Sequence, residues 1–390
     1  MDKPAYLHPG IGSISALAKA LDVHPDLLVS IANRVEESYT SFDIPKKAEN
    51  EFRTVSEPKY ELKRIQRKIN SRIFELVTYP PYLQGGIKDD NNSRDYVKNS
   101  SIHVKPAVLV NLDIKNFYPN IHRDLVLNVF KNFFHFEPQV AELLTKLTTL
   151  NNRVPQGGCC SSYLANLIFY SDEFKLVQEL RKSGWRYSRL LDDITISCIE
   201  NIEDHITPIK KIASLCTKYK LKINNKKTDI NHRAKGIAKL NVTGVWIGHG
   251  VPKLKKDERR HIRQLIYICE QKFQVEPHSE KYHEFWNKVS GKVAKLARLN
   301  HAEASRLRKR LQATLPIFDT HGRNSLIKEV KTLCSKHANQ SQRIGFINRV
   351  NRAFHKIGIL SRTEVWLSKK LRSELLEKHG SLPSLKEFWS

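Results

Sequence analysis

Two short apolar runs of this chain carry aspartates at places where a carboxylate is hard to bury. Asp113 ends the run AVLVNLD, and Asp192 and Asp193 lie inside YSRLLDDITIS. The first run is short, apolar and β-branched, which predicts a buried strand, and the second predicts a hairpin whose turn holds the aspartate pair. Burying adjacent carboxylates without partners costs free energy. The pattern therefore predicts strand ends at which acidic side chains meet cations.

The aspartate pair by itself also has a simpler explanation, because aspartate is common in exposed turns. Asp113 weakens that explanation, since phosphoryl transfer from a nucleoside triphosphate needs two divalent ions held by oxygen ligands. Mg²⁺ keeps several waters and takes one or two carboxylates together with substrate phosphates. We therefore predict a metal-dependent nucleotide polymerase whose catalytic residues are Asp113, Asp192 and Asp193.

The charge of the chain points to a polyanionic partner. There are 66 Lys and Arg against 40 Asp and Glu, a formal net charge of +26, and so strong an excess is expected near nucleic acid. Each basic cluster alone is explained as a solvated helix face, but their sum predicts a long binding surface. The clusters lie at Lys63–Arg72, Lys226–Lys239, Lys253–Arg263 and Lys292–Arg310.

Length and composition set the broad class. A chain of 390 residues with 40% hydrophobic content can bury a large core in two or three domains. The first residues carry no apolar signal-peptide core and no run of about 18 apolar residues could span a bilayer, so we expect a cytoplasmic protein without a membrane partner. The six cysteines form no C-x-x-C pair, which favours free thiols in a reducing compartment.

The spacing of apolar residues predicts the remaining elements. Residues 11–75 and 122–150 have helical periodicity, and CCSSYLANLIFYSDEFKLVQELRKSG has the length of one long helix ended by Gly184. The segment PPYLQGGIKDDNNSRDYVKNSS has the Pro, Gly, Asn and Asp density of a loop. Residues 311–390 contain alternating helical runs, which predict a small basic helical domain.

Several segments resemble, in order and separation, the successive motifs of reverse transcriptases. LDIKNFYPNI, VPQGGCCSSYLANLIF and YSRLLDDITIS resemble palm motifs, and INNKKTDI resembles the lysine-bearing motif that follows. NSSIH at Asn99–His103 and NVTGVWIGHGVPKLKKDERRHIRQL are most similar to bacterial retron and related defence-associated reverse transcriptases. The resemblance spans residues 60–310 and does not reach 311–390.

The resemblance implies an α+β, right-hand polymerase fold. It would have fingers, a palm whose antiparallel sheet carries the aspartates, a helical thumb and a C-terminal helical extension. We expect an N-terminal helical region over 1–60, fingers and palm over 61–240, the Val-Thr-Gly segment and basic thumb helices over 241–310, and the extension over 311–390.

The resemblance also assigns roles at the polymerase site. Asp113, Asp192 and Asp193, with the backbone carbonyl of Ile114, would hold two Mg²⁺ ions, for which Mn²⁺ is a substitute. Tyr118, five residues after Asp113, would lie against the sugar, where a bulky ring excludes a ribose 2′-OH. The other residues expected to bind nucleotide are Gln156, Gly157, Lys227 or its neighbour Lys226, and, from the fingers, Arg94 and Lys105, with Lys88 and Lys98 as further candidates.

A structured RNA is the expected macromolecular partner. The retron resemblance assigns RNA recognition to Val242, Thr243 and Gly244, although a strand with a glycine bulge also explains them. Phosphate contacts are expected from the basic helix that follows, at Lys253, Lys255, Lys256, Arg259 and Arg260. The extension over 311–390 has as candidate partners RNA, an effector protein or a second copy of the chain, while packing against the thumb explains its apolar faces equally well.

The leading hypothesis is an RNA-directed DNA polymerase of a bacterial antiphage defence system. It would use deoxynucleoside triphosphates and an RNA template or dedicated noncoding RNA to make a DNA product. Leu190-Leu191 stands where the family has Tyr-x before the aspartates, which keeps untemplated or protein-primed DNA synthesis as an alternative. A non-catalytic RNA-binding scaffold is the third hypothesis, and the three carboxylates argue against it because they repel a polyanion.

Overall fold

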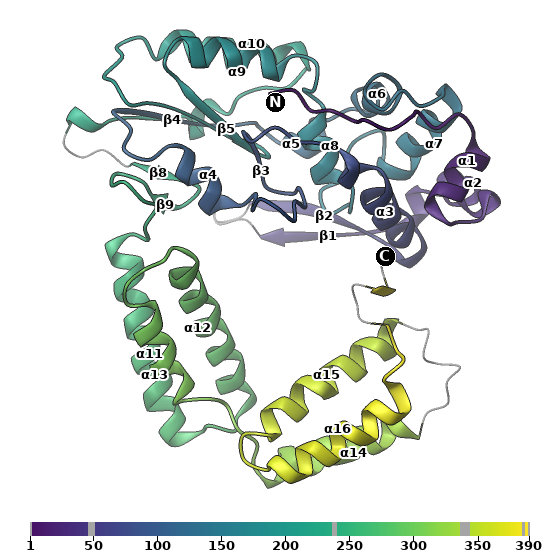
Figure 1. Cartoon of the computed structure of the whole chain (residues 1–390), viewed down its shortest axis with the longest axis vertical. Coiled ribbons are helices and arrows are strands. Elements are labelled where there is room, and N and C mark those ends of the chain that lie inside the picture. The colour runs from purple at the N-terminus through teal and green to yellow at the C-terminus, as the bar shows by residue number, and fades with distance from the viewer. Residues whose placement is uncertain (1, 46–50, 236–239, 336–343, 384–386, 389–390) are drawn as a thin grey trace. The chain divides into compact units, whose positions relative to one another are not determined.

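A computed structural model describes residues 2–45, 51–235, 240–335, 344–383 and 387–388 of the chain. The chain divides into two compact units, Met1–Pro252 and Lys253–Ser390. All strands of the described residues belong to the first unit, and the second unit is built from helices (Figure 1). Among the described residues, no helix is long and apolar enough to cross a membrane.

The first unit is organised around a five-stranded sheet with the order β3-β5-β6-β4-β7. The β3–β5 pair is parallel and the other pairs are antiparallel. The strand predicted before Asp113 and the hairpin predicted around Asp192 are confirmed. The strands are β3 (Leu83–Gln84), β4 (Val108–Asp113), β5 (Arg186–Leu190), β6 (Asp193–Cys198) and β7 (Asp229–His232).

Helices pack against this sheet and continue its core. Helices α9 (Glu173–Lys182) and α10 (Ile206–Lys218) lie side by side (Figure 1), and each buries an apolar stripe that includes Val177 and Ile212. The aromatic rings of Phe74, Phe130 and Phe134 extend the same core. The other helices of the unit are α1 (Ile14–Leu21), α2 (Pro25–Asn33), α3 (Tyr60–Arg72), α4 (Tyr96–Ile102), α5 (Phe117–Asn120), α6 (Arg123–Asn128), α7 (Pro138–Thr148) and α8 (Ser161–Leu167).

The expectation of a continuous helical region over 11–75 is wrong between α2 and α3. Strands β1 (Tyr39–Pro45) and β2 (Phe52–Pro58) form an antiparallel ribbon there. Alternating, largely polar positions suit a ribbon that is exposed along most of its length. Cross-strand hydrogen bonds stabilise it, from Thr54 Oγ1 to Asp43 Oδ1 at 2.7 Å and between the hydroxyls of Ser41 and Ser56 at 2.8 Å.

The single long helix expected before Gly184 is also wrong, because the chain breaks between α8 and α9. The Tyr170 N–H donates to the Leu167 carbonyl, three residues back, instead of continuing the α-helical pattern to Asn166. The carbonyl of Asn166 accepts a hydrogen bond from the buried guanidinium of Arg189. A contact from a distant strand thus interrupts a sequence whose local spacing is helical.

The Val-Thr-Gly segment packs with the sheet of the first unit. Strands β8 (Asn241–Val242) and β9 (Val245–Trp246) form a hairpin, with Thr243 and Gly244 in its turn at φ 47° and φ 82°. Val242 is fully buried against Leu109 of β4. The grouping of this segment with the basic helices over 241–310 therefore differs from the division of the chain, which follows Pro252.

The second unit contains two groups of three helices that contact one another within each group. Helices α11 (Lys256–Val275), α12 (Glu280–Arg298) and α13 (Ala304–Gln312) make the first. Helices α14 (Thr320–Cys334), α15 (Ile344–Leu360) and α16 (Val365–His379) make the second and share a core of their own. The helical runs predicted over 311–390 are confirmed in α14, α15 and α16, while residues 336–343 of these runs lie outside the described residues. Packing of these three helices among themselves accounts for much of their apolar faces.

Candidate active site

The three aspartates converge where β4 meets the β5–β6 hairpin. Asp113 and Asp193 are direct cross-strand partners, a position that brings Cβ atoms to about 4.5–5.5 Å in an antiparallel pair. The Ile114 N–H donates to the Asp192 carbonyl at 2.9 Å, so the turn residue is tied to the end of β4. The fold therefore gathers onto one sheet edge carboxylates that lie far apart in sequence.

Burial and neighbouring negative charge make Asp192 and Asp193 hard to ionise. Burial, with the neighbouring charges of Asp192 and Asp113, raises the pKa of Asp193 to about 6. Burial and the charge of Asp113 raise the pKa of Asp192 as well. Both causes disfavour the negative form, so the cluster gains from any cation that enters it.

Lys227 supplies one such cation. Its Nζ lies 2.6 Å from Asp113 Oδ1, and the Asn224 amide donates to Asp113 Oδ2 at 3.3 Å. The hydrogen bond to Asp113 raises the pKa of Lys227. The alternative Lys226 has an exposed side chain, and the geometry places Lys227, rather than Lys226, against the carboxylates.

The donor set fits hard divalent ions without forming a closed cage. Within the described ranges, no group of three or more His, Cys, Asp or Glu side chains forms a ready-made metal site. Lys227 pairs with one oxygen of Asp113. Mg²⁺ needs only one or two carboxylates with waters and phosphates, and the acidic oxygens here meet that need. The Ile114 carbonyl as a ligand stays a prediction.

Tyr118 lies beside the carboxylates, in α5. Burial raises its pKa, and the charge of Asp192 contributes in the same direction. Its hydroxyl is 3.4 Å from Ser162 Oγ of α8. Gly86, at φ 66°, lies close to Ser162 and Leu191. A side chain does not fit at this position, because a Cβ there would lie 2.4 Å from Ser162 Cβ and 3.2 Å from Leu191 Cδ2. Neither Ser162 nor Gly86 is among the residues predicted from the sequence, where the only local signal is the glycine pair Gly85-Gly86.

The Gln156-Gly157 loop lies against the β1–β2 ribbon. The Ser56 N–H donates to the Gln156 carbonyl at 2.8 Å. Gly157 has φ 113°, and a Cβ there would come within 2.8 Å of Val55 Cγ1 and 2.9 Å of the Ser56 carbonyl. The close approach that requires glycine is therefore to β2, and nucleotide contact by Gln156 and Gly157 stays a prediction.

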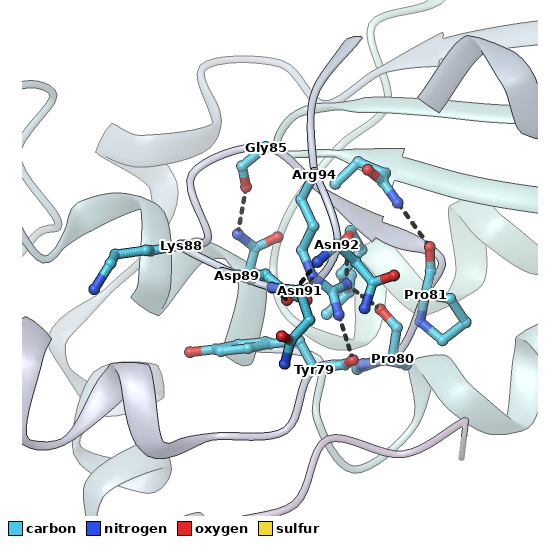
Figure 2. A network of polar contacts seen from close by, with 12 residues as sticks. Tyr79, Pro80, Pro81, Gly85, Lys88, Asp89, Asn91, Asn92 and Arg94 are labelled. Carbon is cyan, nitrogen blue, oxygen red and sulfur yellow. Dashed lines mark hydrogen bonds and ion pairs between the residues drawn. The ribbon is translucent and has the colours of Figure 1, made fainter. Parts of the chain in front are cut away.

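Nucleotide binding by Arg94 stays a prediction, and the structure engages this side chain within its own loop. Its guanidinium pairs with Asp89 at 2.8 Å and donates to the carbonyls of Tyr79, Pro80 and Leu83. Figure 2 shows this side chain enclosed by its own loop, while Lys88 extends away from it. With only 10% of the side chain exposed, Arg94 fastens the loop and has little capacity left for a phosphate.

Nucleotide binding by Lys105 also stays a prediction, and this residue precedes β4 while Asp113 ends it. The strand alone separates them by roughly 17 Å at 3.3 Å per residue. The Lys105 N–H donates to the Ile247 carbonyl, beside the β8–β9 hairpin. Lys88 is paired with Glu75 at 2.7 Å, and Lys98 is an exposed residue of α4.

The residues expected to bind RNA divide into buried and exposed sets. Val242 is fully buried, which excludes direct contact, and the Thr243 hydroxyl donates to the Tyr96 carbonyl. Gly244 is exposed at the turn. At the start of α11, Arg259 is half-buried against His301 at 3.1 Å, whereas four side chains face solvent: Lys253, Lys255, Lys256 and Arg260.

Two buried polar networks include residues of the β5–β6 hairpin. His103 lies between the hydroxyls of Ser197 and Ser188 at 2.8 and 2.7 Å, and burial lowers its pKa to about 3. The Ser188 hydroxyl in turn donates to Asn99, so the Asn and His of NSSIH are buried packing residues. The second network, the ion pair of Arg189 with Glu173, was not recognised because nothing local in the sequence links the two.

Proteins of one family match most of this chain. The reverse transcriptase (RNA-dependent DNA polymerase) family matches residues 44–267. The chain is 40% identical over 381 residues to the retron Se72 reverse transcriptase of Salmonella heidelberg, covering 96% of this chain and 98% of that protein. It is 30% identical to the retron Ec48 reverse transcriptase of Escherichia coli, covering 92% and 90%.

A solved structure of telomerase from Candida albicans matches 89% of this chain and 70% of the telomerase chain, at 11% identity and a TM-score of 0.38. This likeness is too low to support an argument. The sequence relatives and the family match cover most of the chain, including β4 and the β5–β6 hairpin. The chain therefore belongs to the reverse transcriptase family, among its bacterial retron members, and is an RNA-directed DNA polymerase.

Proposed function

We propose that Asp113, Asp192 and Asp193 hold two Mg²⁺ ions, replaceable by Mn²⁺, and that this site copies RNA into DNA. The observation that carries the proposal is the meeting of β4 and the β5–β6 hairpin, which joins three carboxylates at one sheet edge. Burial and mutual repulsion raise the pKa of Asp192 and Asp193, and bound divalent cations would relieve that repulsion.

The side chains around the carboxylates would handle the nucleotide. Asp113, Asp192 and Asp193 would hold the ions, which would supply Lewis-acid and charge stabilisation for phosphoryl transfer. Lys227, whose side chain is 64% exposed, would turn from Asp113 toward the phosphates. Tyr118 would lie under the deoxyribose and exclude a 2′-OH, and Gln156 and Gly157 would lie beneath the base pair.

In this proposal the two units have the parts of a right-hand polymerase. The β1–β2 ribbon and α3 would belong to the fingers, the five-stranded sheet to the palm, and α11, α12 and α13 to the thumb. The second unit has 30 Lys and Arg against 13 Asp and Glu, so it carries most of the excess positive charge of the chain. Such a surface would grip RNA and its DNA product through phosphates, without sequence choice.

We further propose that the RNA is a dedicated structured noncoding RNA and that the DNA serves antiphage defence. The support is the similarity of nearly the whole chain to retron reverse transcriptases. An effector protein or a second copy of the chain would bind outside the polymerase site.

The altered hairpin favours testing one alternative, untemplated or protein-primed synthesis. Leu190 packs on Gly85, where a Cβ would lie 3.1 Å from Leu190 Cγ. An aliphatic residue thus fills the position at which the family places a tyrosine near the primer end. The carboxylates and Lys227 would serve that reaction equally well.

The test is incorporation of labelled deoxynucleotides by the protein purified with its bound nucleic acid, beside Asp192→Ala. We expect Mg²⁺-dependent DNA complementary to one bound RNA, and none from the variant, which should still bind RNA. Product that is unchanged after the RNA is digested would move the function to untemplated or protein-primed synthesis. Equal product from both proteins would remove Asp192 from the chemistry, and no product from either would favour a scaffold.

A further inference from the structure

We propose that Arg189 is a positioning residue for the carboxylate hairpin. With Glu173 it fixes the peptide that joins Leu191 to Asp192, and so sets the metal affinity of the site. The inference rests on the proposed metal-binding role of Asp192, and it assigns to a buried ion pair a task in the reaction that packing alone does not require.

The guanidinium of Arg189 is fully buried and fully used. It forms a bidentate pair with Glu173, Nε to Oε1 at 2.6 Å and Nη2 to Oε2 at 2.8 Å. Its other N–H groups reach three carbonyls, those of Ala165 at 3.1 Å, Asn166 at 3.1 Å and Leu191 at 3.3 Å. These contacts employ all five donors of a guanidinium, so one side chain holds the end of α8, the start of α9 and the hairpin turn together.

The contact with Leu191 matters because this residue is strained. Leu191 has φ 59°, in the left-handed region that a branched side chain rarely adopts and that surrounding contacts must enforce. Arg189 holds its carbonyl on one side of Asp192. On the other side, the Asp192 carbonyl accepts from the Ile114 N–H. The backbone of Asp192 is thus fixed by both flanking peptide groups.

The same network reaches the nucleotide side of the site. The Asn166 amide donates to the carbonyls of Gly85 and Ser162, both at 3.0 Å. Ser162 in turn faces the Tyr118 hydroxyl. Because Arg189 bonds the Asn166 carbonyl, it links the carboxylate turn to α8, whose Ser162 contacts Tyr118 of α5.

Stability alone does not call for this ion pair. Exchange of a buried ion pair for apolar side chains of similar volume is often neutral or stabilising, whereas removal of one partner leaves an uncompensated charge. What an apolar pair cannot do is donate to the Leu191 carbonyl. Groups that orient metal ligands in this way typically change metal affinity or activity 10- to 100-fold when removed.

The test removes both charges at once, so that the protein still folds. Arg189→Met with Glu173→Leu is made in a Tyr187→Phe background, because the Tyr187 hydroxyl donates to Glu173 and would otherwise have no acceptor. Mn²⁺ binding is measured by electron paramagnetic resonance without nucleotide or nucleic acid, together with the Mg²⁺ dependence of kcat. The controls are Tyr187→Phe alone and Arg186→Met, another arginine of β5, which donates to the Val104 carbonyl.

We expect about 10- to 100-fold weaker Mn²⁺ binding in the charge-free variant, a higher Mg²⁺ requirement for kcat, an unchanged KM for template and primer, and near-normal values in both controls. Wild-type Mn²⁺ affinity in the folded variant would overturn the inference. Arg189→Lys should keep an ion pair with Glu173 but still bind Mn²⁺ weakly. Wild-type Mn²⁺ affinity in this variant would also overturn the inference. If Asp192→Ala itself keeps wild-type Mn²⁺ affinity, the proposed metal site fails instead.

Discussion

At the scale of single residues, the proposed metal ion would have to compete with Lys227 for the same oxygen of Asp113. The ammonium lies 2.6 Å from Asp113 Oδ1. Lys227→Gln should therefore bind Mn²⁺ about two- to fivefold more tightly without substrate, the size of a largely exposed ion pair. The same variant should have a raised KM for deoxynucleoside triphosphate, because it lacks the cation proposed to meet the phosphates.

Lys226→Gln is the matched control for this prediction, since its side chain is exposed next to Lys227 in the same turn. Metal titration and steady-state kinetics of both variants give the two readouts. Weaker metal binding by Lys227→Gln would show that the lysine supports the metal site instead of competing with it.

The carboxylates also give the site a pH dependence whose sign follows from their pKa values. Asp193 has its pKa raised from 3.8 to about 6, so the folded state keeps a proton that the unfolded chain releases. Its contribution to stability is therefore full below about pH 4 and declines as the pH rises through 6. Without metal, the thermal midpoint of the wild type should fall relative to Asp193→Asn over this window.

Metal binding should show the opposite trend, because Mg²⁺ requires the ionised carboxylates. The Mg²⁺ concentration for half-maximal incorporation should be higher at about pH 5.5 than at about pH 7.5. The stabilisation of the folded protein by Mg²⁺ should grow over the same range. A Mg²⁺ requirement that does not change between these conditions would contradict the coupling of Asp192 and Asp193 to the metal.

At the scale of elements, the β8–β9 hairpin is a support for the strand that carries Asp113. Val242 packs on Leu109 of β4, and the Asn111 amide donates to the Asn241 carbonyl at 3.0 Å. Residues 109, 111 and 113 share one face of the strand, so the hairpin covers the face that continues to the active site. The Val-Thr-Gly segment therefore has a packing role that is independent of RNA.

Val242→Ala should accordingly lower the free energy of unfolding by about 1–3 kcal/mol, measured by urea denaturation, and leave RNA affinity unchanged at a temperature where the protein is folded. Val110→Ala is the control, because Val110 is equally buried on the other face of β4. If Val242→Ala weakens RNA binding without reducing stability, the packing role is wrong and the segment takes part in RNA recognition.

Some elements of this fold can be predicted from local sequence and others cannot. The strand before Asp113 and the hairpin at Asp192 are predictable because apolar β-branched runs are interrupted by charge. The β1–β2 ribbon escaped prediction because its residues are mostly polar and exposed, and the α8–α9 break because Arg189 lies beyond both helices in sequence. The loop contacts of Arg94 could not be predicted because charge alone says nothing about which acceptors the fold supplies.

At the scale of the whole molecule, the smaller unit carries the larger net charge. The first 252 residues have 36 Lys and Arg against 27 Asp and Glu, while the last 138 have 30 against 13. We therefore expect a polyanion to be drawn chiefly to the helical unit, while the proposed polymerase site lies in the less basic unit. Affinity and chemistry can then be altered separately.

This separation predicts how RNA affinity depends on salt. Glutamine at the four exposed positions that begin the second unit should weaken RNA binding and reduce the slope of log Kd against log salt by up to about 3, or about 0.7–0.9 for each phosphate that is no longer neutralised. These positions are Lys253, Lys255, Lys256 and Arg260. The control places glutamine at four exposed lysines of the first unit, Lys19, Lys131, Lys182 and Lys210. Filter binding over a range of salt concentrations measures the slope for both sets of variants. An equal reduction of slope in the two sets would mean that RNA responds to net charge alone, and would contradict the thumb role proposed for α11.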